Sequence, residues 1–474
     1  MINYQKERPA PAAAAESLRT GTQHAMERNL TTGSVLRNIL CFSLPYLFSY
    51  FLQTLYGMAD LFIIGQFGAV ASTTAVSIGS QVMHMLTVMI VGLAMGSTVT
   101  IGRAMGAGDR SLVGRTIGNT VTLFMVLSAA MTAALLAAVR PIVAIMSTPA
   151  EAVEGTVAYL TVCFLGIPCI TAYNIIASIF RGLGDSKSPM YFIAVACAAN
   201  IGLDYLFIGA LSMGPAGAAL GTTLSQAISV AVSLAVILRR RTGFAVHRAD
   251  FRPQRAVLRQ VLKIGLPVAF QDGLIQIAFI VITVIANRRG LTDSAAVGIV
   301  EKIISFLFLV PSSMLSTVSA LGAQNIGAGK HDRAALTLRY AIRIAAGFGL
   351  AAGILMQFIA APVVGLFTAD TAVIAAGGQY LRGYIWDCIF AGIHFSFSGY
   401  FCAYGRSEIS FLHNIIAIAL VRVPGVYLMS VLFADTLYPM GLATATGSLL
   451  SVVICLAAYG WLKRKGALGA PIQV

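Results

Sequence analysis

Long apolar blocks recur through most of the chain and leave few alternatives for its fold. They follow one another from position 35 to 462, and each has about the 20 to 25 residues that a helix needs to cross a bilayer. Only 11% of all residues are charged, whereas soluble domains carry about 25%. The sequence therefore predicts an all-α polytopic protein of the lipid bilayer and argues against a soluble enzyme.

Blocks bounded by charged residues, Gly or Pro predict twelve transmembrane helices. The expected spans are residues 35–60, 72–98, 112–138, 152–180, 188–210, 215–238, 258–287, 293–320, 333–358, 374–404, 408–433 and 439–462. Residues 1–34 combine scattered charges with an Ala/Pro-rich run and are expected to form a disordered cytoplasmic tail.

The two halves of the chain resemble one another. Motif FRGLGDS at residues 180–186 matches FCAYGRS at 401–407, and MGAG at 105–108 matches IGAG at 326–329, both at an offset of 221. We expect an N-terminal six-helix lobe at 35–238, a cytoplasmic linker at 239–262, a C-terminal six-helix lobe at 263–462 and a tail at 463–474. Six is an even number, so both copies enter the membrane from the same side. The lobes should then be related by a pseudo-two-fold axis along the membrane normal, around a central cavity.

The net charge of +14 is explained by topology. If the N-terminal tail is inside, most of the Lys and Arg residues fall on inside segments, as the positive-inside rule requires. Both termini are therefore expected in the cytoplasm of a bacterial or archaeal cell, with the spans in the inner membrane. A nucleic-acid partner is not needed to explain the charge, and a monomer is expected.

Motifs of ATP-driven or hydrolytic chemistry are absent from the sequence. There is no GxxxxGK[ST], HExxH or GxSxG, and the six His residues lie at no ligand spacing. The seven Cys residues form no CxxC and are interpreted as small apolar residues. The chain is thus expected not to be an enzyme, to need no cofactor, and to draw any driving force from an Na⁺ or H⁺ gradient.

Acidic residues occur inside the expected spans, at Asp60, Asp204, Asp272, Glu301 and Asp387. A carboxylate at mid-membrane costs about 2.5 to 3.5 kcal/mol, so such residues are rare without a function. Tyr56 lies four residues before Asp60, and Asn200 four before Asp204, so each pair shares a helix face. Carboxylate, amide and hydroxyl oxygens are ligands for a hard cation, and two nearby carboxylates can hold a proton.

The sequence leaves two interpretations of the remaining acids open. They are hydrated near a span end, or they line a substrate cavity. The candidate cavity residues are Gln53, Asp272, Gln276, Glu301 and Asp387. Glu301 can also pair with Lys302 or Arg422.

Prolines interrupt several expected spans. They are Pro45, Pro168, Pro267, Pro311 and Pro424. Because proline removes a helix hydrogen bond, each is expected to produce a kink or hinge.

Several longer motifs resemble one transporter family. They are FSLPYLFSYFLQTLYGMADLFIIGQFG at 42–68, RAMGAGD at 103–109, FRGLGDSKSP at 180–189, NIGLD at 200–204 and GPAGAALGTTLSQ at 214–226. Over about residues 35–462 the chain resembles the multidrug and toxic compound extrusion (MATE) transporters, and it is most similar to their archaeal and DNA-damage-inducible bacterial branch.

The resemblance implies a cation-coupled antiporter that exports organic cations or amphipathic drugs by alternating access. It also implies a coupling-ion site, Na⁺ or H⁺, in the N-terminal lobe, and the matching residues are Asp60, Asn200, Asp204 and Thr222, with Tyr56 and Tyr159 as neighbours. Another branch of the family uses acids of spans 7 and 10, but Asp272 and Asp387 do not match its register well.

A flippase for lipid-linked oligosaccharides or peptidoglycan precursors, from the same superfamily, is the alternative function. Such flippases usually have a more cationic cavity, whereas the mid-span bases here are Lys302 and Arg422.

Overall fold

The structure is a computed structural model, and it describes residues 28–239 and 246–468. Residues 1–27, 240–245 and 469–474, which belong to the expected N-terminal tail, linker and C-terminal tail, lie outside the described residues. The described residues are largely helical and contain no strand.

The first half of the chain forms six membrane-spanning units. They are α2 (Val35–Phe67), α3 (Val70–Ala107), α4 (Arg110–Ile145), the pair α5 (Val153–Leu165) and α6 (Ile167–Gly182), α7 (Lys187–Asp204) with a π-helical end (Tyr205–Ala210), and α8 (Gly214–Arg239). A short 3₁₀ turn at Ala150–Ala152 precedes α5, and another at Arg248–Phe251 follows α8.

The second half repeats this order. Its units are α9 (Arg255–Asn287), the pair α10 (Leu291–Leu307) and α11 (Leu309–Gly327), α12 (His331–Val364), the pair α13 (Thr371–Tyr384) and α14 (Asp387–Ala403), α15 (Ser407–Ala417) continued by a π-helical turn (Ile418–Arg422) and α16 (Val423–Leu432), and α17 (Tyr438–Arg464).

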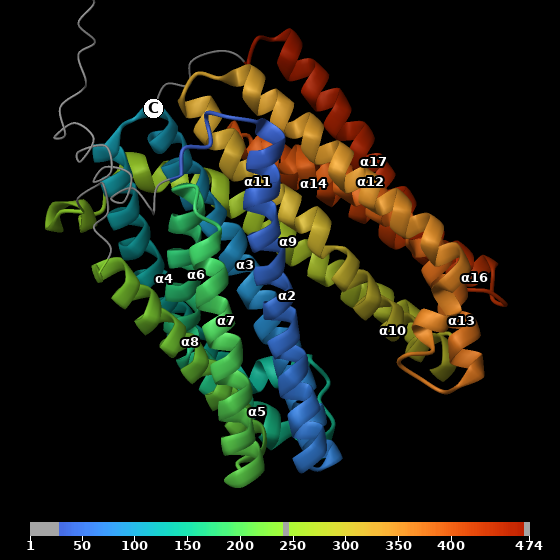
Figure 1. Cartoon of the computed structure of the whole chain (residues 1–474). Helices are drawn as coiled ribbons and strands as arrows, with labels where there is room; N and C mark the ends of the chain where they lie inside the picture. The colour runs from blue at the N-terminus through green and yellow to red at the C-terminus, as the bar shows by residue number, and fades with distance from the viewer. Residues whose placement is uncertain (1–27, 240–245, 469–474) are drawn as a thin grey trace, which may run out of the picture.

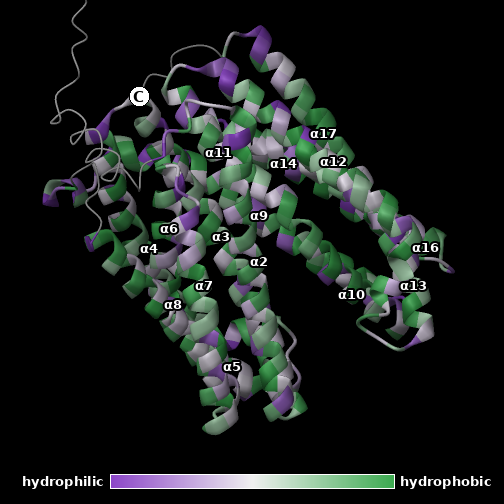
Figure 2. Cartoon of the chain, viewed as in Figure 1, coloured by the Kyte–Doolittle hydropathy of each residue, from purple (hydrophilic) through white to green (hydrophobic). Residues whose placement is uncertain are grey.

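Twelve units with these bounds confirm the predicted fold class. Ten in the described part of the chain are long and apolar enough to cross a membrane, and the α5–α6 pair, bent by 49°, is an eleventh. The twelfth, α13–α14, is the counterpart of α5–α6 at the repeat offset, since α6 ends at Gly182 and α14 at Ala403. Figure 2 shows hydrophobic residues along the shafts of the helices and hydrophilic residues gathered toward their ends.

Prolines mark breaks between helices in three of the five expected cases. Pro45 and Pro267 lie inside the continuous helices α2 and α9. In contrast, Pro168 and Pro424 occupy the first turn of α6 and α16, and Pro311 the first turn of α11. Proline is tolerated at a helix start because the amide it lacks would have no partner there.

The helices form two lobes, α2–α8 and α9–α17, which meet at one end and diverge toward the other (Figure 1). The contact end is the one at which the described chain begins, and there α3 of the first lobe packs against α9 and α11 of the second. Glycine makes this close approach possible. A Cβ at Gly106 of α3 would collide with the Gln324 carbonyl of α11, and a Cβ at Gly327 would collide with the Arg103 carbonyl.

Candidate functional site

The predicted ion-site residues of the first lobe come together from three helices. Asp60 lies near the end of α2, Asn200 and Asp204 on the last turns of α7, and Thr222 on α8. The Thr222 hydroxyl donates a 2.9 Å hydrogen bond to Asp60 Oδ2, and Asp60 and Asp204 act on one another electrostatically. Asp60, Asn200 and Asp204 are 4%, 0% and 0% exposed, so this cluster is inside the lobe.

Polar atoms in this cluster are left without partners. Asp60 Oδ1, both Asp204 oxygens, and Asn200 Oδ1 and Nδ2 form no hydrogen bond of good geometry among the described residues, although Asn200 and Asp204 lie close enough to act on the Asp60 carboxylate. No Lys or Arg forms an ion pair with either carboxylate in the described part of the chain. Two carboxylates buried together are unfavourable unless a cation or a proton lies between them. The donor set of carboxylate, amide and hydroxyl oxygens therefore fits a hard cation or a shared proton.

The two predicted tyrosines flank the acids. Tyr56 lies one turn before Asp60 on α2, and Tyr159, on α5, is only 2% exposed. The charge of Asp60 acts on both phenols. A Cβ at Gly79 of α3 would collide with the Tyr159 ring, so this glycine provides the space for Tyr159.

Two further residues of the site were not predicted from the sequence. Gln226 is buried one turn after Thr222 on α8, interacts with Tyr56, and has an unpartnered Oε1. Its i,i+4 spacing from Thr222 was the signal that could have identified it. Gly221 lies against Asp204, and a Cβ there would collide with Asp204 Oδ1.

The five predicted cavity residues do not form one cluster. Gln53 interacts with Tyr56 in the first lobe. Asp272 lies on α9 where that helix meets α3, with Oδ2 2.8 Å from the position of a Cβ at Gly92, and Gln276 follows one turn later. Glu301, on α10, accepts from the Thr283 hydroxyl at 3.1 Å and interacts electrostatically with Lys302 and Arg422.

The fifth cavity candidate, Asp387, is fully buried inside the second lobe and pairs with Arg422. Arg422 Nη2 lies 3.2 Å from Asp387 Oδ2 and donates a 2.7 Å hydrogen bond to the Tyr384 hydroxyl. The sequence offered Lys302 and Arg422 as partners for Glu301. Of these, Arg422 forms its ion pair with a different acid, Asp387.

A reciprocal pair of hydrogen bonds joins the lobes at the contact end. Arg103, near the end of α3, donates to the Ala403 carbonyl at the end of α14, at 2.9 Å from Nε and 2.6 Å from Nη2. Gln324 of α11 donates to the Gly182 carbonyl at the end of α6, at 3.1 Å. Arg103 and Gln324 are 221 residues apart, as are Gly182 and Ala403, so the two contacts are equivalent under the internal repeat.

The segment before α2 adds further hydrogen bonds at the end where the two lobes meet. Leu30 is 1% exposed, and its amide donates to Gln324 Oε1 at 3.1 Å, while the Arg28 amide donates to the Leu183 carbonyl at 3.2 Å. Lys330 donates to the Thr31 carbonyl at 2.9 Å. Residues 28–31 of the expected tail therefore bridge the two lobes.

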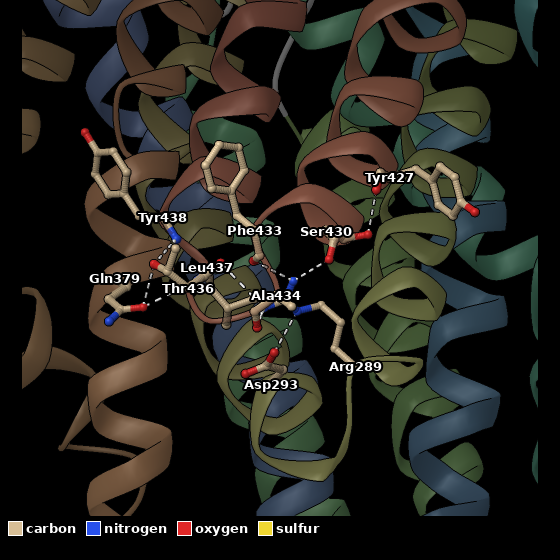
Figure 3. Close-up of polar contacts among 10 residues, drawn as sticks. All are labelled: Arg289, Asp293, Gln379, Tyr427, Ser430, Phe433, Ala434, Thr436, Leu437 and Tyr438. Atoms are coloured by element: carbon tan, nitrogen blue, oxygen red, sulfur yellow. Dashed lines mark hydrogen bonds and ion pairs between the residues drawn. The ribbon is translucent and has the colours of Figure 1, made fainter.

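The opposite end of the second lobe is held by Arg289 (Figure 3). Its guanidinium lies 2.7 Å from Asp293 Oδ2 and donates to the carbonyls of Ser430 at 2.6 Å and Ala434 at 2.7 Å. Gln379 of α13 accepts from the Thr436 hydroxyl at 2.9 Å beside it. One arginine thus ties the α9–α10 turn to the loop between α16 and α17.

The chain resembles known proteins over most of its length. It is 26% identical over 430 residues to Probable multidrug resistance protein YpnP of Bacillus subtilis, covering 90% of this chain and 95% of that protein. It is 24% identical over 434 residues to a FAD transporter of Shewanella oneidensis, covering 90% and 94%. A MOP superfamily transporter from Pyrococcus furiosus has the same fold, with a TM-score of 0.86 at 23% identity over 93% of this chain and 98% of that one.

The MatE family model matches residues 45–206 and 267–428, one copy in each lobe. The two copies begin 222 residues apart, close to the offset of the internal repeat, and together they span more than half of the chain. The chain therefore belongs to the MATE family and is a multi-pass membrane transporter, not an enzyme.

Proposed function

We propose that this transporter is a cation-coupled antiporter that exports organic cations or amphipathic drugs and takes its driving force from ions bound in the first lobe. The observation that carries the proposal is the pair of buried carboxylates, Asp60 and Asp204, with unpartnered oxygens and no basic partner among the described residues. The name of the Bacillus subtilis relative, a multidrug resistance protein, supports the drug-export part.

Ion binding would bias the packing of α2, α7 and α8. A Na⁺ or H⁺ bound between Asp60, Asn200, Asp204 and Thr222 neutralises the acids and favours close packing of the three helices. Release of the ion leaves buried charge and favours a state that admits water. The ion thus shifts a two-state equilibrium, as coupling to substrate movement requires.

The available driving force depends on substrate charge. One ion entering supplies about 2.3 kcal/mol per 100 mV and about 1.4 kcal/mol per tenfold ion gradient. For a neutral amphipathic compound both contributions apply, which is enough for roughly hundredfold accumulation. For a monovalent organic cation, one-for-one exchange moves no net charge and only the ion gradient contributes.

Alternating access is supported by the arrangement of the lobes. They are hydrogen-bonded to one another at the end carrying Arg103 and Gln324 and diverge at the other end. Under the positive-inside rule the joined end is cytoplasmic, so this arrangement corresponds to an outward-open state of a monomer in the inner membrane.

Dye efflux from proteoliposomes tests ion coupling, with Na⁺ and H⁺ gradients imposed separately. Asp60→Asn and Asp204→Asn should each abolish gradient-driven efflux at near-normal expression. Gly425→Ala is the control at the second-lobe position equivalent to Asp204, where a Cβ meets Ala443 at an ordinary 3.5 Å. Wild-type efflux in both Asn variants would contradict the site assignment and favour Asp272 and Asp387.

Substrate competition separates drug export from two alternatives with anionic substrates, export of FAD and flipping of lipid-linked sugars. An organic cation is offset by carboxylates such as Asp272 and Glu301, and contact with aromatic rings adds about 0.5 to 2 kcal/mol. We expect lipophilic monovalent cations to be transported in preference to FAD, which the Shewanella relative is named for, and to anionic lipid-linked sugars. Equal or faster transport of the sugar would favour the flippase, and of FAD a nucleotide exporter.

A further inference from the structure

The second lobe contains a buried acid whose charge is balanced by the protein itself. Asp387 is 0% exposed, and its partner Arg422 is 8% exposed. The guanidinium is held by Asp387 Oδ2 at 3.2 Å and the Tyr384 hydroxyl at 2.7 Å, with the ring of Phe279 5.4 Å from its central carbon. This arrangement differs from the first lobe, where no base among residues 28–239 and 246–468 pairs with the buried acids.

A glycine on the last helix of each lobe lies against the residue that carries the buried charge: against the carboxylate of Asp204 in the first lobe and against the start of the Arg422 side chain in the second. In the first lobe Gly221 of α8 lies against Asp204 of α7. In the second, a Cβ at Gly447 of α17 would approach Arg422 Cβ to 2.7 Å. Helices α8 and α17 correspond at an offset of 224, which superposes the Pro-x-Gly motifs at 215–217 and 439–441. At that offset Gly221 corresponds to Ala445, so corresponding helices, at different positions along them, contact the acid in one lobe and the arginine in the other.

The acid of the second lobe also lies at a different position in the internal repeat from the acids of the first lobe. Asp387 begins α14 after the break that follows α13, and at the repeat offset it corresponds to Gly166, in the break between α5 and α6. Asp387 Oδ1 and Arg422 Nε form no hydrogen bond of good geometry among the described residues, although Ser448 lies close enough to act on the Asp387 carboxylate. A cavity of about 30 Å³ beside Arg422, lined by apolar side chains together with His394, Asn414 and Ser448, has room for one water molecule.

We propose that Arg422 is a tethered cation that does permanently for the second lobe what the transported ion does for the first. Its guanidinium neutralises Asp387 and so prevents a mobile cation from binding there, which limits each transport cycle to the ions of the first lobe. The proposal rests on the proposed coupling site at Asp60 and Asp204. Its consequence is that removing the guanidinium converts Asp387, with the Tyr384 hydroxyl, into a second cation site.

The number of ions per cycle tests this inference. In proteoliposomes with fixed gradients of Na⁺ or H⁺ and of a neutral amphipathic compound, every ion moved carries one net charge, so the membrane potential at which net flux stops reports the number of ions per cycle. Arg422→Met keeps much of the side-chain volume without the charge and should add one ion per cycle. Arg422→Lys, which keeps a cation, should match wild type, and so should the neutral double variant Asp387→Asn/Arg422→Met.

Each outcome decides the proposal. An unchanged ion number in Arg422→Met would overturn it, as would the same increase in the double variant, because Asp387 would then not be the second site. If Arg422→Met does not fold, the double variant still tests the claim, since loss of ion coupling in it would show that the second-lobe acid takes part in wild-type coupling. Asp60→Asn in the wild-type background separates the two proposals: coupling that survives this change refutes the first-lobe site, whatever Arg422→Met does.

Discussion

At the scale of single residues, Gly221 sets the position of the Asp204 carboxylate, because the acid occupies the space that a side chain at 221 would need. Gly221→Ala should displace Asp204 and reduce gradient-driven efflux by about tenfold or more. Gly202→Ala is the matched control, since it lies on the same helix as Asp204 with no atom within 4 Å of its added Cβ. Equal efflux in the two variants would show that the close packing of Asp204 against α8 is not needed for ion-driven transport.

Arg289 shows how one base at the end where the lobes diverge can have a structural role. Its removal leaves Asp293 and several carbonyls without a donor, and hydrogen bonds from a charged group contribute about 1.5 to 3 kcal/mol each. Because the site is partly exposed, Arg289→Ala should lower the free energy of unfolding by about 2 to 4 kcal/mol. Thermal unfolding in detergent measures this. The neighbouring Arg288 is exposed, and Arg288→Ala should unfold at the same temperature as wild type. Identical thermal midpoints for the two variants would refute the structural role of Arg289.

At the scale of helices, the breaks within spans occur next to prolines and buried polar side chains. Three of the five prolines expected to kink a span lie in the first turn of the helix that follows a break, where proline costs least, and the α5–α6 span is bent by 49° at its break. Buried polar groups lie next to such breaks: Asp387 begins α14, and Arg422 ends the π-helical turn before Pro424. Interrupted helices in a membrane expose backbone groups that need polar partners, so breaks and buried polar side chains occur together.

The reciprocal contacts of Arg103 and Gln324 should control how readily the lobes separate at their joined end. Native Cys402, 1% exposed among residues of α3, α9 and α11, is a reporter for this seam. With the other cysteines replaced, Arg103→Ala and Gln324→Ala should each speed alkylation of Cys402 by about tenfold.

The exposed base Lys187, on the first turn of α7, provides the control for this experiment. Lys187→Ala should leave the alkylation rate of Cys402 unchanged. If all three variants react at the wild-type rate, the contacts between the lobes do not hold the seam closed.

At the scale of the whole molecule, charge distribution predicts the orientation in the membrane. Arg248, exposed on the turn that follows α8, should be cytoplasmic, and Arg288, exposed at the opposite end, should be outside. In a Cys-free background, an impermeant thiol reagent applied to intact cells should label Arg288→Cys and spare Arg248→Cys. The reverse labelling pattern would show that the protein has the opposite orientation and that the arrangement of lobes described here is inward-open.

The sequence alone was sufficient for properties that depend on local pattern. Apolar block length predicts the twelve spans, the recurrence of motifs at 221 residues predicts the two lobes, and i,i+4 spacing places Tyr56 with Asp60 and Asn200 with Asp204. These follow from helix periodicity and bilayer thickness, which act on neighbouring residues. The ends of the helices were less predictable, because α2 and α3 continue past their expected ends at 60 and 98, to Phe67 and Ala107.

Only the tertiary structure decided which buried charges have partners. Asp60 and Asp387 look alike in the sequence, as acids within apolar spans. Asp387 meets Arg422, 35 residues away, whereas Asp60 meets Thr222 and a second acid. The same holds for Arg103, whose acceptor lies 300 residues away in the other lobe. Such pairings are set by how distant helices pack, and a pattern within one helix carries no information about the side chain that the packed neighbour presents.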